Sequence, residues 1–271
     1  MKLLPTAYDI GYALAALVWP LFPKRRRLSI DNIMRAGVAS DLATARKIAK
    51  KAWCHLPGHI CEALRVPSVV RADNWRDHLD FSQAHPEAVK LLLDRTDTPI
   101  ILVSSHHGVW EAATNVISFA RPMIAIARVM NNKLVAWWMK KHHFRGRVTV
   151  IDKNNGFSPD IMRKWREERS AMTILMDQHT SGGAMLKFMG RPAKTFTSAA
   201  RLAMRTGYPI VVGSFVRIAP YRYALVGGEP LVFAKDSDRD ANAQLLNDRL
   251  EAAIRLYPEQ YLWAHRRWRF D

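Results

Sequence analysis

The chain has 271 residues, of which 49% are hydrophobic and 24% are charged, so a packed core is expected and intrinsic disorder is excluded. Lys and Arg number 41 against 24 Asp and Glu, which gives a formal net charge of +17. An excess of this size indicates an anionic partner: a membrane surface, a phosphorylated lipid, an acidic protein or a nucleic acid. The two cysteines, Cys54 and Cys61, match neither a disulfide framework nor a CxxC metal pair, which favours reduced thiols.

The N-terminal stretch at residues 3–22 is mostly apolar, and the basic residues 24–27 follow it at once. About 20 apolar residues are needed to cross a bilayer as a helix, and the positive-inside rule would keep the basic cluster cytoplasmic. We therefore expect residues 1–23 to form a hydrophobic membrane helix that anchors one domain over residues 24–271, either by spanning the bilayer or by lying in its interface. A buried core helix is the alternative.

Helical spacing of apolar residues predicts a helix over residues 41–65, with Asp41 as its N-cap. Pro57 and Gly58 are expected to interrupt this helix. A second helix is predicted over residues 86–95, where Pro86 suits the first turn.

Short apolar runs then alternate with helical patterns, which predicts an α/β fold in which helices flank a mixed, mostly parallel central sheet. Ligands of such sheets bind beyond the carboxyl ends of the strands. The expected strands are residues 99–103, 123–127, 148–152, 172–177 and 209–216, and the expected helices are residues 110–119, 134–144, 159–168, 197–205 and 239–256.

Polar clusters follow three of these strands, at residues 104–111, 128–132 and 177–183. In the first cluster, His106 and Glu111 would not share a helix face, because five residues turn a helix by about 500°. They can meet if His106 lies in the strand-to-helix turn, which Gly108 permits, and Glu111 lies in the first helical turn. The carboxylate would then orient a histidine base. Alone, this pair is more typical of ordinary polar residues at a strand end than of a catalytic pair.

Three sequence blocks strengthen the interpretation. The stretch SHHGVWE resembles the HxxxxE signature of the bacterial lipid A biosynthesis (late) acyltransferase family, of the lauroyl and myristoyl type. The block that begins MDQHTSGG resembles the Asp-Gln block of that family with its Gly-Arg-Pro continuation, and PEQYLWAHRRWR resembles its terminal segment. The blocks occur in family order over residues 104–269. His107 departs from the pattern, since an aromatic residue is usual there.

The resemblance implies a glycerol-phosphate-acyltransferase-like fold and an O-acyltransferase on the cytoplasmic side of the bacterial inner membrane. Acyl carrier protein would supply the fatty acyl chain, and a hydroxyl of a lipid A precursor would accept it. His106 would be the general base and Glu111 its orienting partner, with no metal, no cofactor and no covalent acyl-enzyme. Backbone N–H groups near Gly108, or Arg128, would stabilise the oxyanion.

Four further residues are predicted to bind substrate: Arg128, Asp177, Gln178 and Arg191. Arg128 matches the post-strand arginine of the family but could equally be a surface residue. Asp177 could instead tie its loop through backbone N–H groups. The basic residues of the C-terminal tail, Arg266, Arg267 and Arg269, are candidates for contact with phosphate or with the carrier protein.

Other functions stay open at this point. The acceptor could be another membrane glycolipid, such as a phosphatidylinositol mannoside, or an aminolipid. A nucleic-acid-binding protein would account for the charge but not for the His–Glu pair or the apolar N-terminus. A metallohydrolase would use the ten histidines, yet the sequence HHGVWE lacks the HxxH and HExxH spacings that place two ligands on one metal.

Overall fold

A computed structural model of the chain describes residues 6–127, 148–152 and 157–268. The predicted helix at 134–144 and the candidate residues Arg128 and Arg269 lie outside these ranges. A central sheet and a hairpin contain the described strands: β1 (Leu79–Asp80), β2 (Ile100–Ser104), β3 (Met123–Ala127), β4 (Val148–Asp152), β5 (Ala171–Leu175), β6 (Ala184–Phe188), β7 (Arg191–Thr195), β8 (Ile210–Ala219) and β9 (Arg222–Gly227).

The central sheet has seven strands in the order β1-β9-β8-β2-β5-β3-β4. Only the β8–β9 pair is antiparallel among the described pairs of this sheet, so the predicted mixed, mostly parallel α/β sheet is confirmed. β2 lies between β8 and β5, and its apolar run is buried along its whole length. A strand buried on both faces reads as a continuous apolar run, which explains why this strand was evident from the sequence.

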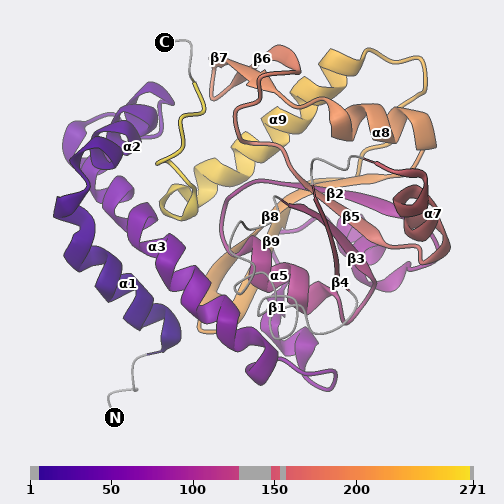
Figure 1. The fold of residues 1–271 in the computed structure, drawn as a ribbon, viewed down its shortest axis with the longest axis horizontal. Coiled ribbons are helices and arrows are strands. Elements are labelled where there is room, and N and C mark those ends of the chain that lie inside the picture. The colour runs from indigo at the N-terminus through magenta and orange to yellow at the C-terminus, as the bar shows by residue number, and fades with distance from the viewer. Residues whose placement is uncertain (1–5, 128–147, 153–156, 269–271) are drawn as a thin grey trace.

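Helices cover both faces of the sheet (Figure 1). In β2, Ile100 and Leu102 point to the core that also contains α5, whereas Ile101 and Val103 point to the core that contains α8 and α9. The described helices are α1 (Ala7–Val18), α2 (Pro23–Arg35), α3 (Leu42–Val69), α4 (Pro86–Val89), α5 (Trp110–Ile117), α7 (Pro159–Glu167), α8 (Ser198–Thr206) and α9 (Arg239–Leu256), with 3₁₀ turns at Trp19–Leu21, Trp75–His78 and Pro258–Gln260 and a π-helical turn at Lys90–Asp94.

α3 begins as predicted, because the Asp41 carboxylate accepts a hydrogen bond from the Thr44 N–H at 2.8 Å. The predicted interruption at Pro57 and Gly58 is wrong, since α3 runs unbroken to Val69. The two residues serve helix packing instead. A Cβ on Gly58 would lie 2.9 Å from the Tyr8 ring, and a Cβ on Gly11 of α1 would lie 2.6 Å from the Pro57 carbonyl oxygen. Small residues at these positions let α1 lie directly on α3.

The N-terminal stretch folds as α1, a 12-residue helix that is about 18 Å long at 1.5 Å per residue. This length is short of the ~30 Å hydrocarbon core of a bilayer. Within the described residues, no helix combines the length and the apolar character that crossing a membrane requires, so the spanning form of the predicted membrane helix has no support. Asp9, inside the apolar stretch, forms a capping box with Thr6.

The packing of α1 on α3 generates a prediction. Gly11→Val should lower the free energy of unfolding by roughly 1–3 kcal/mol, because the new side chain meets a backbone carbonyl that cannot move freely. Denaturant unfolding followed by circular dichroism measures the change. Gly182→Ala is the matched control, since nothing lies within 4 Å of a Cβ there. Equal stability of the two variants would contradict this account of α1.

Candidate active site

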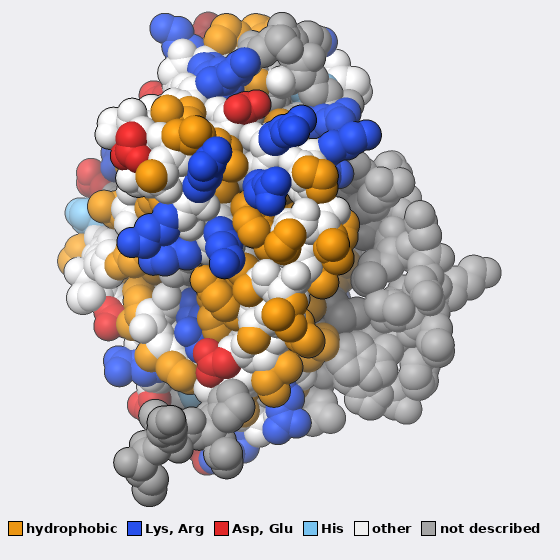
Figure 2. All heavy atoms as spheres, turned by 90° about the vertical axis from the view of Figure 1, so that its left-hand side faces the viewer, with side chains coloured by type: hydrophobic (Ala, Val, Ile, Leu, Met, Phe, Trp, Pro, Cys, Tyr) orange, Lys and Arg blue, Asp and Glu red, His pale blue; other side chains and the backbone are white. Residues whose placement is uncertain are grey.

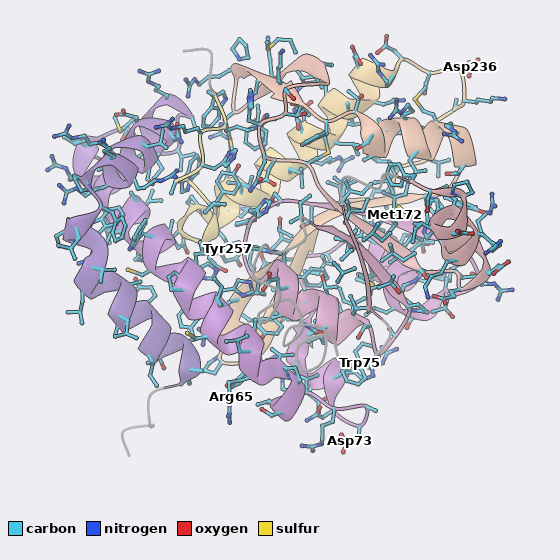
Figure 3. The ribbon with its side chains drawn as sticks, in the orientation of Figure 1. Arg65, Asp73, Trp75, Met172, Asp236 and Tyr257 are labelled. Atoms are coloured by element: carbon cyan, nitrogen blue, oxygen red, sulfur yellow. The ribbon has the colours of Figure 1, made fainter. Side chains whose placement is uncertain are left out.

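The parallel pairing of β2 with β5 brings two of the polar clusters together. Ser104 is in register with Leu175, and the Met176 N–H continues the ladder to the Ser104 carbonyl at 3.2 Å. His106 follows β2 and Asp177 follows β5, so both side chains emerge at the same edge of the sheet. Figure 3 labels Met172, which marks β5 within the central sheet.

Both ring nitrogens of His106 have hydrogen-bond partners. Nδ1 lies 2.9 Å from an Asp177 carboxylate oxygen, and Nε2 lies 3.2 Å from the Gln178 side-chain nitrogen. A carboxylate only accepts, so Nδ1 carries a proton, and in the neutral ring Nε2 then has a free lone pair that accepts from the Gln178 amide. This is the tautomer that a general base acting through Nε2 requires.

The charges around His106 favour its protonated form. Burial alone would lower the pKa of His106, but the Asp177 carboxylate and, less strongly, Glu111 outweigh it and raise that pKa above its usual range. Burial would raise the pKa of Asp177, yet His106 and its hydrogen bonds hold it below the usual range. Burial raises the pKa of Glu111, although His106 opposes the change. Side-chain exposure of 2% for Asp177 and 21% for His106 leaves only the imidazole open to substrate.

Gly108 sets the shape of the catalytic turn, which we define as residues 106–109. Its φ is +69°, and a Cβ would lie 1.9 Å from the Phe215 carbonyl oxygen, so no other residue fits. Its N–H donates to the Gln260 carbonyl at 3.0 Å, and the Val109 N–H donates to the Phe215 carbonyl at 2.7 Å. Both N–H groups are thus occupied, so neither is available to an oxyanion; for the other backbone donors near Gly108, the oxyanion role stays a prediction.

The block that begins PEQY holds the catalytic turn from the other side. The Leu262 N–H donates to the His106 carbonyl at 3.1 Å, and His107 donates from Nε2 to the Tyr257 carbonyl at 3.0 Å. Tyr257 follows α9 and is labelled in Figure 3. His107 is fully buried, and burial lowers its pKa to about 4, so it is a neutral structural residue. The terminal block therefore fixes the position of His106.

The other predicted site residues differ in how they relate to His106. Glu111 lies in the first turn of α5, as predicted, and acts on His106 through its charge. Nδ1 of His106 donates its hydrogen bond to Asp177, for which the sequence predicts a role in binding substrate or tying a loop. An orienting role for Glu111 stays a prediction. Arg191 lies in β7, where its guanidinium stacks 4.5 Å from the Trp268 ring centroid.

Arg267 of the tail is not a surface residue. It is 2% exposed, and it donates to the carbonyls of Gln178 and Lys194 and to the Thr195 hydroxyl at 2.7 Å. It thereby fixes the loop that carries Asp177 and Gln178. Its candidacy for phosphate contact is wrong, because the side chain is buried and both terminal guanidinium nitrogens donate inside the protein.

Two further residues shape the site: Trp110, which belongs to the signature but had no predicted role, and His55, which the sequence did not indicate. The Trp110 ring stands edge-on to His106 with centroids 5.2 Å apart, and His55 of α3 lies 3.0 Å from the Gly108 carbonyl oxygen. The aromatic at position 110 was a readable signal, but His55 lies 53 residues before Gly108 and carries no motif. Over the described ranges, no group of three His, Cys, Asp or Glu side chains is arranged to hold a metal.

The family model described as bacterial lipid A biosynthesis acyltransferase matches residues 4–270. The chain belongs to this family. It is 25% identical over 171 residues to the lipid A biosynthesis palmitoleoyltransferase of Escherichia coli (strain K12) and, equally, to the lipid A biosynthesis acyltransferase of Shigella flexneri. Each alignment covers 63% of this chain and 56% of the relative, so the similarity spans about half the length of these lipid A acyltransferases.

The electrostatics of the pair generate a pH prediction. A base works when deprotonated, so turnover should rise with pH through a midpoint above the usual pKa of histidine. Asp177→Asn removes the largest raising influence. Its midpoint should therefore fall toward or below the usual value, and its maximal kcat should fall by up to roughly 10⁴-fold as the imidazolium loses its partner. The pH profile of kcat measures both changes, and an unshifted midpoint would argue against this pairing.

Proposed function

We propose that the chain transfers a fatty acyl chain from the thioester of acyl carrier protein to a hydroxyl of a lipid A precursor, on the cytoplasmic side of the bacterial inner membrane. Membership of the lipid A acyltransferase family supports the reaction class. The formal charge of +17 suits two acidic substrates, a carrier protein and a phosphorylated lipid. The hydrogen bond from His106 to Asp177 is the observation that carries the proposal, because it places the proton on Nδ1 and leaves Nε2 with the lone pair that a base needs.

The proposed step is direct transfer without an acyl-enzyme. The acceptor O–H gives its proton to Nε2 of His106 as its oxygen attacks the thioester carbonyl carbon. The tetrahedral intermediate then collapses, the C–S bond breaks, and the leaving thiolate takes the proton back from the imidazolium. Asp177 and Glu111 stabilise the imidazolium between these two events. A thiolate is a good leaving group, so the proposed reaction requires no serine or cysteine nucleophile from the protein.

Gln178 marks the place of the acceptor hydroxyl. Its amide occupies Nε2 of His106 at 3.2 Å, where the hydroxyl must donate, so substrate displaces this contact. The displaced amide N–H groups of Gln178 would then donate to the developing oxyanion. The N–H groups of Gly108 and Val109 do not fill this role, because they are bonded within the protein. Arg128 is a second proposed donor, and Arg191 would contribute to substrate binding from β7.

The lipid-binding face that we propose is the outer surface of α1. Its inner positions Gly11 and Ala15 pack against the protein. The apolar outer positions of α1 and of the turn that follows it are exposed, at Ile10, Leu14, Leu17, Val18, Leu21 and Phe22. Figure 2 shows hydrophobic side chains gathered on this side of the molecule beside a band of Lys and Arg. The basic residues 24–27 begin α2 directly afterwards. An apolar strip beside a basic cluster is typical of a helix that lies in the interface of an anionic membrane.

The base assignment generates a test of the reaction. His106→Ala should lower acyl transfer to a lipid A precursor by roughly 10²–10⁴-fold without loss of the fold. The assay mixes purified protein, acyl carrier protein charged with a fatty acid, and the precursor in detergent, with the product measured by mass spectrometry. His107→Gln is the control, because the amide can still donate to the Tyr257 carbonyl. Equal losses in both variants would remove His106 from its assigned role.

The lipid-binding face generates a second test. Leu17 and Leu21 are 75% and 73% exposed, so changing both to Glu should leave the fold intact. Binding to vesicles of phosphatidylcholine and phosphatidylglycerol should fall at least roughly tenfold, since each buried Leu contributes about 1.5–3 kcal/mol. Val232 and Leu256 are 67% and 63% exposed elsewhere, and the same double change there is the matched control. Unchanged vesicle sedimentation of the Leu17 and Leu21 variant would overturn the assignment.

A further inference from the structure

A buried chain of hydrogen bonds joins α1 to the catalytic turn. The Tyr8 hydroxyl of α1 lies 3.0 Å from Nδ1 of His55 in α3, and Nε2 of His55 lies 3.0 Å from the Gly108 carbonyl oxygen. His55 is 4% exposed. The chain thus runs from the helix that carries the lipid-binding face to the residue two positions after His106.

The chemistry of the partners fixes the direction of each bond. A carbonyl oxygen only accepts, so Nε2 of His55 carries the proton, and Nδ1 accepts from the Tyr8 O–H. Burial lowers the pKa of His55 to about 4, which keeps the ring neutral and in this single tautomer. The histidine is therefore matched to both neighbours at once, as a donor to the catalytic turn and an acceptor from α1.

Tyr8 has a second connection to the same turn. Its ring lies against the Arg217 guanidinium, with 3.8 Å between the guanidinium carbon and the ring centroid. Arg217 forms a bidentate pair with Glu62, which is fully buried. The Arg217 backbone exchanges two hydrogen bonds with the Gln260 side chain, both of 2.9 Å. Gln260 in turn holds the Gly108 N–H.

The two connections meet at Gly108. The Gln260 carbonyl accepts a hydrogen bond from the Gly108 N–H, and His55 donates one to the Gly108 carbonyl. His55 contacts α1 directly, and Gln260 is connected to α1 through Arg217. Glycine has a wide range of backbone conformations in isolation, so these bonds help to hold the turn in place, together with those of the Val109 and Leu262 N–H groups. A displacement of about 1 Å at a catalytic group can cost roughly 10²-fold in rate.

We propose that His55 is a positioning residue for His106, and that Tyr8 links it to α1, so that the seating of α1 on lipid and the placement of the catalytic base are coupled. The proposal rests on the proposed function of His106 and of the lipid-binding face. His55 acts through the Gly108 carbonyl and does not contact the reacting atoms.

The kinetic test uses the purified full chain with charged acyl carrier protein and a lipid A precursor presented in phosphatidylcholine and phosphatidylglycerol vesicles. Tyr8→Phe and His55→Phe should each lower kcat by roughly tenfold, with KM for the acyl donor unchanged, because a buried bond that aligns the base is lost. His55→Gln retains a donor for the Gly108 carbonyl and should restore most of kcat. The double variant Tyr8→Phe, His55→Phe should be no slower than His55→Phe alone.

Tyr12→Phe is the matched control, since Tyr12 lies one turn further along α1 and packs against Tyr8 with ring centroids 5.8 Å apart. It should keep kcat within about twofold of wild type. Wild-type kcat in Tyr8→Phe, a loss confined to KM, or a His55→Gln as slow as His55→Phe would each overturn the proposal. If His55→Phe does not fold, Tyr8→Phe carries the test, because it removes one oxygen and keeps the ring over Arg217.

Amide hydrogen exchange tests the coupling without activity. In the wild type, vesicles should slow exchange at Gly108 and Val109, and Tyr8→Phe should abolish this slowing while the Tyr12→Phe control retains it. Equal slowing in Tyr8→Phe and wild type would overturn the coupling. Inactive wild type, or full activity in His106→Ala, would instead refute the proposed reaction, and the exchange measurement would still decide whether α1 and the catalytic turn are linked.

Discussion

Parallel pairing of β2 with β5 is the constraint on which the site depends, because it delivers Asp177 to Nδ1 of His106. The hydrogen bond sets the tautomer, and the carboxylate charge outweighs the cost of burying an imidazolium. Neither strand could slip by one residue, since the slip would turn Asp177 to the opposite face of the sheet. The apolar residues that lock the register in both cores therefore also set the surroundings of the candidate base, so fold stability and the pKa of His106 depend on the same contacts.

Much of the sheet was predictable from the sequence, and the reason is local. β2, β3 and β4 are short apolar runs at the predicted positions, and Asp41 caps α3 as its chemistry requires. The sequence does not encode which strands are neighbours in an equally direct way. His106 and Asp177 are 71 residues apart, so the partner at Nδ1 emerged only from the strand order. Pro57 and Gly58 wrongly predicted a break in α3, because their role also depends on a distant part of the chain. Their positions matter to another helix, and tertiary packing overrode the local signal.

Two sets of basic residues differ in their surroundings. Residues 24–27 begin α2 beside the apolar strip of α1, where their positive charge would complement anionic lipid at the proposed lipid-binding face. Arg267 and Arg217 are largely buried and donate hydrogen bonds to carbonyls, a hydroxyl and the Glu62 carboxylate. A formal charge of +17 counts both groups alike. The clustering of basic residues in the tail suggested a ligand, whereas the donor geometry of Arg267 makes it a brace for the loop of Asp177 and Gln178.

Gln260 and Leu262 close the catalytic turn, and both are made long after the turn itself. A ribosome releases the chain from its N-terminus, so His106 emerges long before the segment that holds its carbonyl. At about 5–20 residues per second, the interval is on the order of ten seconds. During this time β2 can pair with β5 only once the latter has emerged, and the turn around Gly108 lacks its final partners. In the nascent chain, His106 is thus expected to become ordered only after residues 260–262 have been made.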